Sequence, residues 1–326
     1  MKDVLKKIFK YTLSLALAGA LLWVSFRGVK WADFLSSIKE CRWEWIILSM
    51  VAGAFAFWLR GLRWHQLLIP FDKSVSRLTT FNGINIGNIS NFLFPRIGEF
   101  VRCGVIVRRS SISYDKVLGT VVLERGWELL VMLMMMAIVL VFGFDRFGSF
   151  FIERIWNPLA QRFDSSLWWI LIGAVVLGFM ALGLIWRLRE SNNLCAKIWK
   201  VFKGVGQGFA SCLKMDRKWL FFAYTLLIWM TYWFMAYAIV KAAPFLDHLD
   251  AIDALFLSLV GGLSFAVPVP AGIGAFHFMI SMTLSVMYEV PVELGVVYAT
   301  LSHTSQAITQ IIFGLGSYAH EAVSSK

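Results

Sequence analysis

Long apolar stretches separated by short charged loops dominate the chain. A helix of about 20 apolar residues crosses a hydrocarbon core of roughly 30 Å. Runs of this kind occupy residues 8–26, 43–59, 117–143, 167–187, 219–241 and 293–318. The pattern predicts an all-α polytopic membrane protein with six full crossings, organised as a single integral membrane domain over residues 1–326.

Two further apolar segments, residues 78–109 and 254–288, are interrupted by glycine and proline. The interrupting residues are Gly83, Gly87, Pro95, Gly98, Gly261, Gly262, Pro268, Pro270, Gly272 and Gly274. Proline removes a backbone donor and glycine weakens a helix, and broken backbone is tolerated at membrane depth only where protein buries it or where it lines a wet cavity. Each segment is therefore predicted to be a re-entrant helical hairpin.

The two interrupted segments share a short sequence, IGEF at residues 97–100 and IGAF at residues 273–276. Their similar composition, their corresponding place in each half of the chain and their opposite predicted directions of entry favour an inverted repeat with a substrate site near the bilayer midplane. Half-helix N-termini offer N–H donors to an anionic group such as phosphate, and Pro95 and Pro270 suit the first turn of such half-helices. A tight turn that only packs between helices is the alternative.

Charge predicts the orientation. The formal net charge is +11, but Lys and Arg lie in short loops, which favours the positive-inside rule over nucleic-acid binding. The loop at 188–218 and the region after the second span, with Arg60 and Arg63, are basic, whereas the loop at 242–253 is acidic. We expect the basic regions and both termini to be cytoplasmic, in a bacterial cytoplasmic membrane.

Ionisable residues inside apolar segments mark candidate sites, because burying them in a membrane is costly. Arg96, Glu99 and Arg102 follow the first break at spacings of three and would form an Arg-Glu-Arg ladder on one side of a helix. An arginine there could hold a phosphate in fork geometry. An ion-pair cluster at the membrane interface is the alternative.

The third span carries Glu124, Arg125 and Glu128 within an otherwise apolar run. These side chains should face the protein interior, where Arg125 would pair with Glu99 or Glu128. A structural salt bridge and a ligand contact remain equally open.

Two histidines are further candidates. His303 begins a polar stripe with Gln306 and Gln310 in the last span, which hydrogen bonding between helices, a proton relay or substrate contact would explain. His277 follows the second shared sequence and is a site candidate by position, although it could equally bond a neighbouring carbonyl.

Other chemistries lack their sequence signals. No P-loop, GxSxG, HExxH or nucleotide fingerprint occurs. The four cysteines show no metal or disulfide spacing. We expect no cofactor and no metal, and no catalytic residue is assigned.

Three motifs together resemble a known family: residues 94–102 (FPRIGEFVR), Glu124-Arg125 followed by Glu128, and residues 268–274 (PVPAGIG). In this order they resemble the flippase-like transmembrane region of lysylphosphatidylglycerol synthases, over about residues 10–318. The resemblance implies a domain involved in moving aminoacylated phospholipid between leaflets. The separate soluble domain that makes this lipid is expected to be absent from a chain that ends at Lys326.

The chain departs from the family pattern at three positions. Ala271 stands where glycine is usual, His277 where an acid is common, and Glu128 where aspartate is usual. The first two departures leave the substrate of this chain open.

The leading hypothesis is a translocator for a phospholipid or lipid-linked anionic substrate, more a transporter than an enzyme. The alternatives are a membrane-embedded transferase acting on a lipid headgroup or polyprenyl phosphate, with Glu99, Glu124 or Glu128 as base, and a noncatalytic membrane subunit. The expected partners are a lipid with an anionic headgroup and either a second copy of the chain or a membrane or peripheral enzyme.

Overall fold

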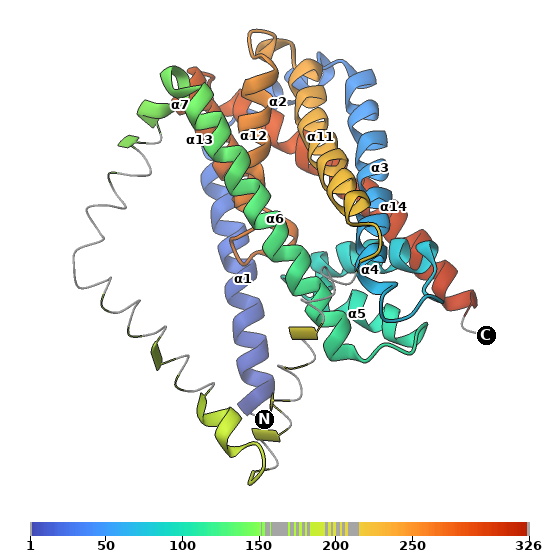
Figure 1. The fold of residues 1–326 in the computed structure, drawn as a ribbon. Coiled ribbons are helices and arrows are strands. Elements are labelled where there is room, and N and C mark those ends of the chain that lie inside the picture. The colour runs from blue at the N-terminus through green and yellow to red at the C-terminus, as the bar shows by residue number, and fades with distance from the viewer. Residues whose placement is uncertain are drawn as a thin grey trace. The chain divides into compact units, whose positions relative to one another are not determined.

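The computed structural model describes residues 2–150 and 215–324 and, between them, only scattered positions, of which 183–192 form the longest run. Of residues 2–8, 10, 149 and 150 only the backbone is described. Every regular element in this part of the chain is a helix (Figure 1). The predicted all-α class is confirmed.

The chain forms two compact units, residues 1–114 with 212–326 and residues 115–211, and each is considered by itself. The larger unit contains, in chain order, α1 (Lys2–Phe26), α2 (Trp31–Lys39), α3 (Trp43–Leu68), α4 (Arg77–Leu93), α5 (Gly98–Arg108), α11 (Lys218–Ala242), η3 (Pro244–Leu246), α12 (Ala251–Ser264), η4 (Pro270–Gly272), α13 (Ala275–Tyr288) and α14 (Val292–Ser324). The smaller unit contains most of α6 (Tyr114–Phe142) and α7 (Phe144–Phe150).

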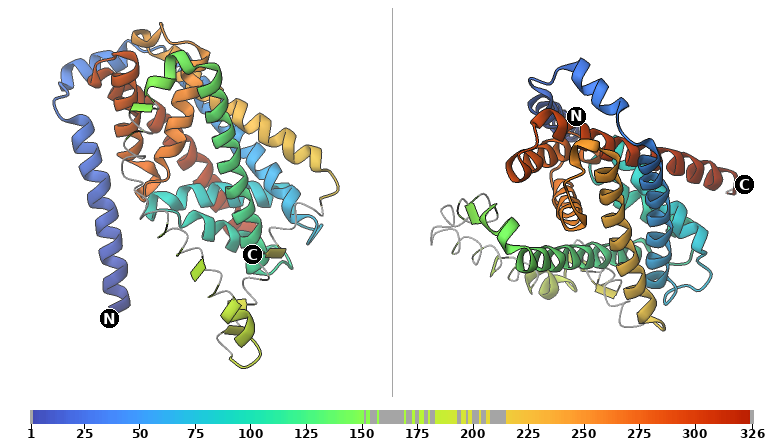
Figure 2. Two further views of the ribbon diagram at one scale, coloured as in Figure 1. Left: turned by 60° about the vertical axis from the view of Figure 1, so that its left-hand side comes forward. Right: turned by 90° about the horizontal axis from the view of Figure 1, so that it is seen from above.

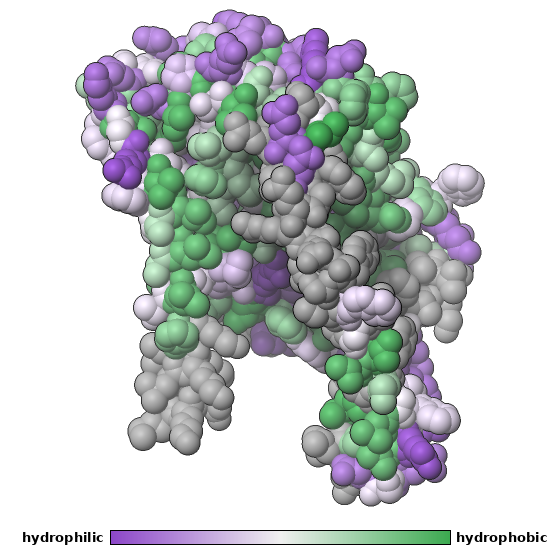
Figure 3. All heavy atoms as spheres, turned by 90° about the vertical axis from the view of Figure 1, so that its left-hand side faces the viewer, coloured by the Kyte–Doolittle hydropathy of each residue, from purple (hydrophilic) through white to green (hydrophobic). Residues whose placement is uncertain are grey.

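Several helices can cross a membrane. Among the described residues, α3, α6, α11 and the segment Pro270–Tyr288 are long and apolar enough, and the pair Tyr11–Phe26 and Trp31–Lys39, bent by 85°, would add a fifth span. On the face drawn in Figure 3, hydrophobic side chains cover much of the described surface, and hydrophilic ones gather in patches, the largest of them at the top of the view. The chain is therefore an integral membrane protein, as predicted.

Five of the six predicted spans coincide with helices, and 167–187 falls mostly outside the described residues. The predicted span 43–59 is too short, because α3 continues to Leu68 and includes Arg60 and Arg63. Arg63 is fully buried, with its guanidinium carbon 5.8 Å from the ring centre of Phe221. The number of six crossings stays a prediction.

The larger unit is built around long packed helices. α3 and α11 lie side by side in each view of Figures 1 and 2 and pack against one another. α14 packs against α3, α4 and α13. This single helix therefore reaches both of the interrupted segments.

Both interrupted segments are broken where the sequence predicted. α4 ends at Leu93 and α5 begins at Gly98, and the two helices pack as a hairpin. α12 ends at Ser264 and α13 begins at Ala275, again packed together, with η4 between them. Re-entry into the membrane and the inverted repeat stay predictions.

The two hairpins are closed in different ways. A Cβ atom on Gly98 would lie 2.0 Å from the carbonyl oxygen of Gly87, so only glycine lets α5 approach α4 so closely. At the second break a Cβ atom on Gly274, whose φ is +82°, would lie 2.5 Å from the carbonyl oxygen of Ala18 in α1. The first hairpin closes on itself, whereas α1 covers the second.

Loops outside the helices are fastened by carboxylates. Asp72, before α4, accepts hydrogen bonds from the hydroxyl and amide of Ser74 and of Ser111, and these bonds lower the pKa of its carboxyl group. Arg42 forms a two-pronged ion pair with Asp247, at 2.8 and 2.5 Å, which lowers the pKa of that carboxyl. Both contacts tie together segments that are distant in sequence.

Candidate functional site

The first break presents an arginine in an unusual backbone conformation. Arg96 has a φ of +60°, which a residue with a Cβ adopts rarely, and its side chain is exposed. Its Nη2 donates to the carbonyl oxygen of Ala266 at 2.8 Å. Asn91 Oδ1 accepts from the amide of Gly98 at 2.8 Å and so holds the start of α5. The side chain of Arg96 thus bonds to the other interrupted segment.

Beyond Arg96 the predicted ladder is formed only in part. Arg102 Nη2 lies 2.5 Å from Glu99 Oε2, and the Arg102 guanidinium carbon lies 4.8 Å from the ring centre of Trp64. Arg102 is buried and Glu99 is half-buried. Arg96 precedes the first residue of α5, so it does not share a helix face with the other two. The expected three-residue ladder is thus an ion pair plus a separate arginine.

The second break is built from backbone in the left-handed region. Ala271, Gly272 and Gly274 have φ values of +48°, +77° and +82°. Pro270 begins the short turn η4, five residues before α13, and Pro95 lies three residues before α5, so neither proline lies in the first turn of these helices, where it was predicted. The hydroxyl of Ser14 in α1 donates to the carbonyl oxygen of Pro268 at 2.7 Å. This break carries no charged side chain of its own.

His277 and His303 meet at the second break. Their ring centres are 5.1 Å apart, and the ring of Phe276 lies 5.7 Å from that of His303. His303 Nε2 lies 3.0 Å from the carbonyl oxygen of Ala271. The sequence placed these residues on separate helices, and the structure brings them together.

The two breaks are neighbours in the larger unit. The Arg96–Ala266 hydrogen bond joins the segment after α4 to the segment after α12, and α4 also packs against η4. Two stretches about 170 residues apart in the sequence thus form one region, with the arginine on one side and the histidine pair on the other. Seven predicted site residues lie in this region: Pro95, Arg96, Gly98, Glu99 and Arg102 at the first break, and His277 and His303 at the second.

Glu124, Arg125 and Glu128 interact within α6, in the smaller unit. Arg125 contacts Glu124 at 3.2 Å and Glu128 at 3.0 Å, and Glu124 is buried. The predicted pairing of Arg125 with Glu128 is confirmed. These contacts describe an intrahelical ion-pair cluster.

An asparagine ladder on α4 was missed in the sequence. Asn82, Asn85, Asn88 and Asn91 recur every third residue. Asn85 is fully buried and donates to Ser317 of α14 at 3.2 Å, and its Oδ1 has no partner among the described residues. The regular spacing of amides in an apolar segment was the available signal, since three-residue spacing keeps neighbours on adjoining helix surfaces.

Other polar groups join the same helices. Arg60 of α3 lies 3.4 Å from Asn88 Oδ1. Gln306 of α14 donates to the carbonyl and the hydroxyl of Ser49 at 3.3 Å, which is the helix-to-helix bonding that the polar stripe had as one explanation. Asn82 donates to Glu321 at 2.8 Å, and Arg109 Nε lies 2.9 Å from the same carboxylate. These bonds fix α14 to α3, α4 and α5.

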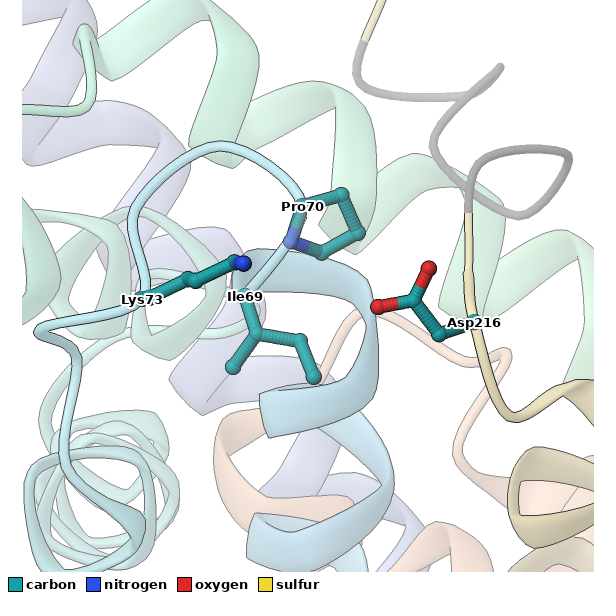
Figure 4. A pocket seen from close by; sticks show the side chains of 4 residues that line it. All are labelled: Ile69, Pro70, Lys73 and Asp216. Atoms are coloured by element: carbon teal, nitrogen blue, oxygen red, sulfur yellow. The ribbon is translucent and has the colours of Figure 1, made fainter.

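A separate pocket of about 460 Å³ lies beyond the C-terminal end of α3. Its described lining residues are Ile69, Pro70, Lys73 and Asp216, and Figure 4 shows the two charged side chains pointing toward the same space. No predicted site residue is among these four. In the described part of the chain no three His, Cys, Asp or Glu side chains are grouped to hold a metal ion.

A comparison with known families agrees with the three sequence motifs. Residues 11–314 match the family described as the lysylphosphatidylglycerol synthase TM region. The chain belongs to this family. The match to the lysylphosphatidylglycerol synthase TM region includes both breaks and the ion-pair cluster of α6. The resemblance based on the three motifs is confirmed. Comparisons with curated proteins and with solved structures gave no match.

Proposed function

We propose that this protein moves a lipid with an anionic headgroup, or a lipid-linked anionic substrate, between the two leaflets of a bacterial cytoplasmic membrane. The main support is the exposed Arg96 at the junction of the two breaks. A guanidinium has five N–H donors, and Ala266 accepts from one of them. The remaining donors suit a phosphate, which arginine binds in fork geometry.

The surroundings support a headgroup rather than a second protein chain. Arg96 is exposed, and half-buried Asn91 and Glu99 are close to it in sequence. Two large apolar side chains are also exposed: Phe94, two residues before Arg96, and Phe265, next to the acceptor Ala266. A charged group flanked by large apolar side chains matches a molecule with a polar head and a hydrocarbon tail. The family description, which names a lipid-modifying synthase, agrees with a lipid substrate.

A leaflet-sidedness assay tests this proposal. The purified protein is reconstituted into vesicles with fluorescent phosphatidylglycerol or phosphatidylcholine, and the fraction of probe accessible to an external quencher is followed. Wild type should move the anionic probe well above protein-free vesicles. Arg96→Ala should reduce the rate by about tenfold, the loss expected for one charge-assisted headgroup contact.

Arg108→Ala is the matched control, because Arg108 is an exposed arginine in the last turn of α5. This variant should keep the wild-type rate. Mass spectrometry of the recovered probe should show an unaltered lipid. Equal rates of probe movement for wild type, Arg96→Ala and protein-free vesicles would contradict the proposal. A covalently changed lipid would instead support the alternative of a membrane-embedded transferase.

A further inference from the structure

The histidine pair lies where proton binding would be linked to the second break. His303 Nε2 must be the donor in its bond to Ala271, because a carbonyl oxygen can only accept. The bond reaches the residue whose φ is +48°, in the middle of the break. The neutral Nε2–H tautomer and the imidazolium can both make this bond, so a proton added to His303 goes to Nδ1 and puts a positive charge next to the turn.

His277 adds an unused polar atom to the same place. Its side chain is buried, and Nδ1 has no hydrogen-bond partner among the described residues. His277 is the third residue of α13, within the first turn, and its ring lies against that of His303. A buried ring nitrogen without a partner is costly, so it marks a group that another species completes.

The N-terminus of α13 is uncapped. No side chain caps this helix, and Phe278 is its first residue whose amide donates to a backbone carbonyl, that of Gly274. In the described structure the amides of Ala275, Phe276 and His277 have no acceptor. Uncapped amides at a helix N-terminus favour a nearby anion and disfavour a nearby cation.

Charged groups on the packed elements do not bond to the pair. Those groups include Tyr11 and Arg27 on or after α1, Lys30 and Asp33 at α2, Asp253 on α12, Glu289 after α13, Glu293 on α14, and Arg96 beside Ala266. Arg27 lies over the ring of Trp23, and Asp253 accepts from Tyr288 at 3.0 Å. Glu293 is ten residues before His303 in α14, about 15 Å along the helix axis. The pair therefore has no carboxylate counter-ion bonded to it within the described structure.

We propose that His277 and His303 form a one-proton site whose proton is taken up together with an anionic headgroup at the second break. Two imidazolium rings at this separation would repel in a buried position, so the pair holds one proton rather than two. An imidazolium beside uncapped amides needs an anion, and the headgroup supplies it. By reciprocity the anion binds more tightly when the pair is protonated. This inference rests on the proposed lipid translocation and adds its coupling ion.

Histidine NMR tests the proton site without any transport measurement. Protein labelled with ¹⁵N-histidine is placed in nanodiscs of phosphatidylcholine alone or with phosphatidylglycerol, and the ring nitrogens are followed from about pH 5 to about pH 8. Wild type should show both rings responding in one shared titration. Its midpoint should rise by about one pH unit in the anionic nanodiscs, a tenfold coupling.

Variants assign the signals and provide the control. His277→Gln and His303→Gln should each remove one ring and shift the titration of the other. His248→Gln, at an exposed position in the loop after η3, should leave the shared titration unchanged. Rings that stay neutral throughout, that titrate independently, or whose midpoint ignores the anionic lipid would each overturn the inference.

Vesicle transport separates this inference from the proposed function. Wild-type flux of phosphatidylglycerol should vary with pH over the range of the NMR midpoint, and His303→Gln should lose that variation. Flux without a shared histidine titration would overturn the proton site and leave translocation standing. A shared, lipid-sensitive titration without flux at any pH would support the proton site and overturn translocation.

Discussion

The two breaks have the same layout and opposite chemistry. Each joins two short helices packed as a hairpin, and each contains a residue with a Cβ in the left-handed region, Arg96 in the first and Ala271 in the second. The first break carries fixed charge on Arg96, Glu99 and Arg102. The second has backbone groups and a histidine pair. Charged side chains and titratable imidazoles thus lie on separate elements that contact each other.

This difference shows two ways in which polar groups are accommodated among apolar helices. The first break neutralises its buried guanidinium with a carboxylate and an indole ring. The second break stays uncharged while the histidines are neutral. Under the proposals above, a site with permanent charge on one side and a proton-dependent charge on the other would bind an anion when the histidine pair is protonated and release it when the pair is neutral.

The largest loss of stability is expected where α4 and α5 of the first hairpin contact each other. Gly98→Ala would place a methyl group 2.0 Å from the Gly87 carbonyl oxygen, so α5 must move away from α4. We expect a loss of about 3 kcal/mol in the free energy of unfolding, the upper range for overpacking. Unfolding by SDS in mixed micelles measures it.

Gly104→Ala is the control on the same helix, because a Cβ there meets nothing within 4 Å. It should be neutral or add up to about 1 kcal/mol, since alanine favours a helix interior over glycine. Equal losses for the two variants would show that α4 and α5 are not closed through Gly87 and Gly98.

The second largest loss of stability is expected for the ion pair between Glu99 and Arg102. Glu99→Gln keeps the shape of the side chain but removes the carboxylate that neutralises buried Arg102. We expect a loss of about 2 kcal/mol, below the range for fully buried pairs because Glu99 is partly exposed. The same unfolding experiment measures it.

Asp247→Asn provides the comparison, since the Arg42–Asp247 pair is exposed on both sides. Its effect should be much smaller, because water and salt screen surface pairs. If raising the salt concentration reduced the Glu99→Gln loss as strongly as the Asp247→Asn loss, the Arg102 pair would be a surface contact.

The left-handed residue of the second break should give the smallest effect. Ala271→Gly relieves about 1 to 2 kcal/mol of strain and costs about 0.5 to 1 kcal/mol of chain entropy, so a net gain of about 0.5 to 1 kcal/mol is expected. Ala275→Gly, in helical backbone at the start of α13, should instead lose about 1 kcal/mol. Losses of the same sign at both positions would argue against the left-handed turn at Ala271.

The sequence predicted the breaks because their causes are local. Proline and glycine interrupt a helix wherever they stand, and both hairpins are broken within the predicted segments. The end of α3 was mispredicted for a related reason. Arg60 and Arg63 look like loop residues, but tertiary contacts with Asn88 and Phe221 keep them in the helix.

The geometry of the site depends on contacts between residues far apart in the sequence, which could not be predicted from local sequence patterns. The left-handed backbone of Arg96 and its reach to Ala266 depend on where the second hairpin lies. The His277–His303 contact needs α13 to pack on α14. The three-residue repeat of asparagines is visible in the sequence, but the bond of Asn85 to Ser317 also depends on how α4 packs against α14.

One helix connects these two chemistries mechanically. α14, with 33 residues, is about 50 Å long. It bonds the second break through His303, meets α4 at Gly314, and holds Asn82 and Arg109 through Glu321. A long helix that is bonded at several points along its length moves as one body. A displacement of α14 at His303 would therefore also displace its contacts with α4.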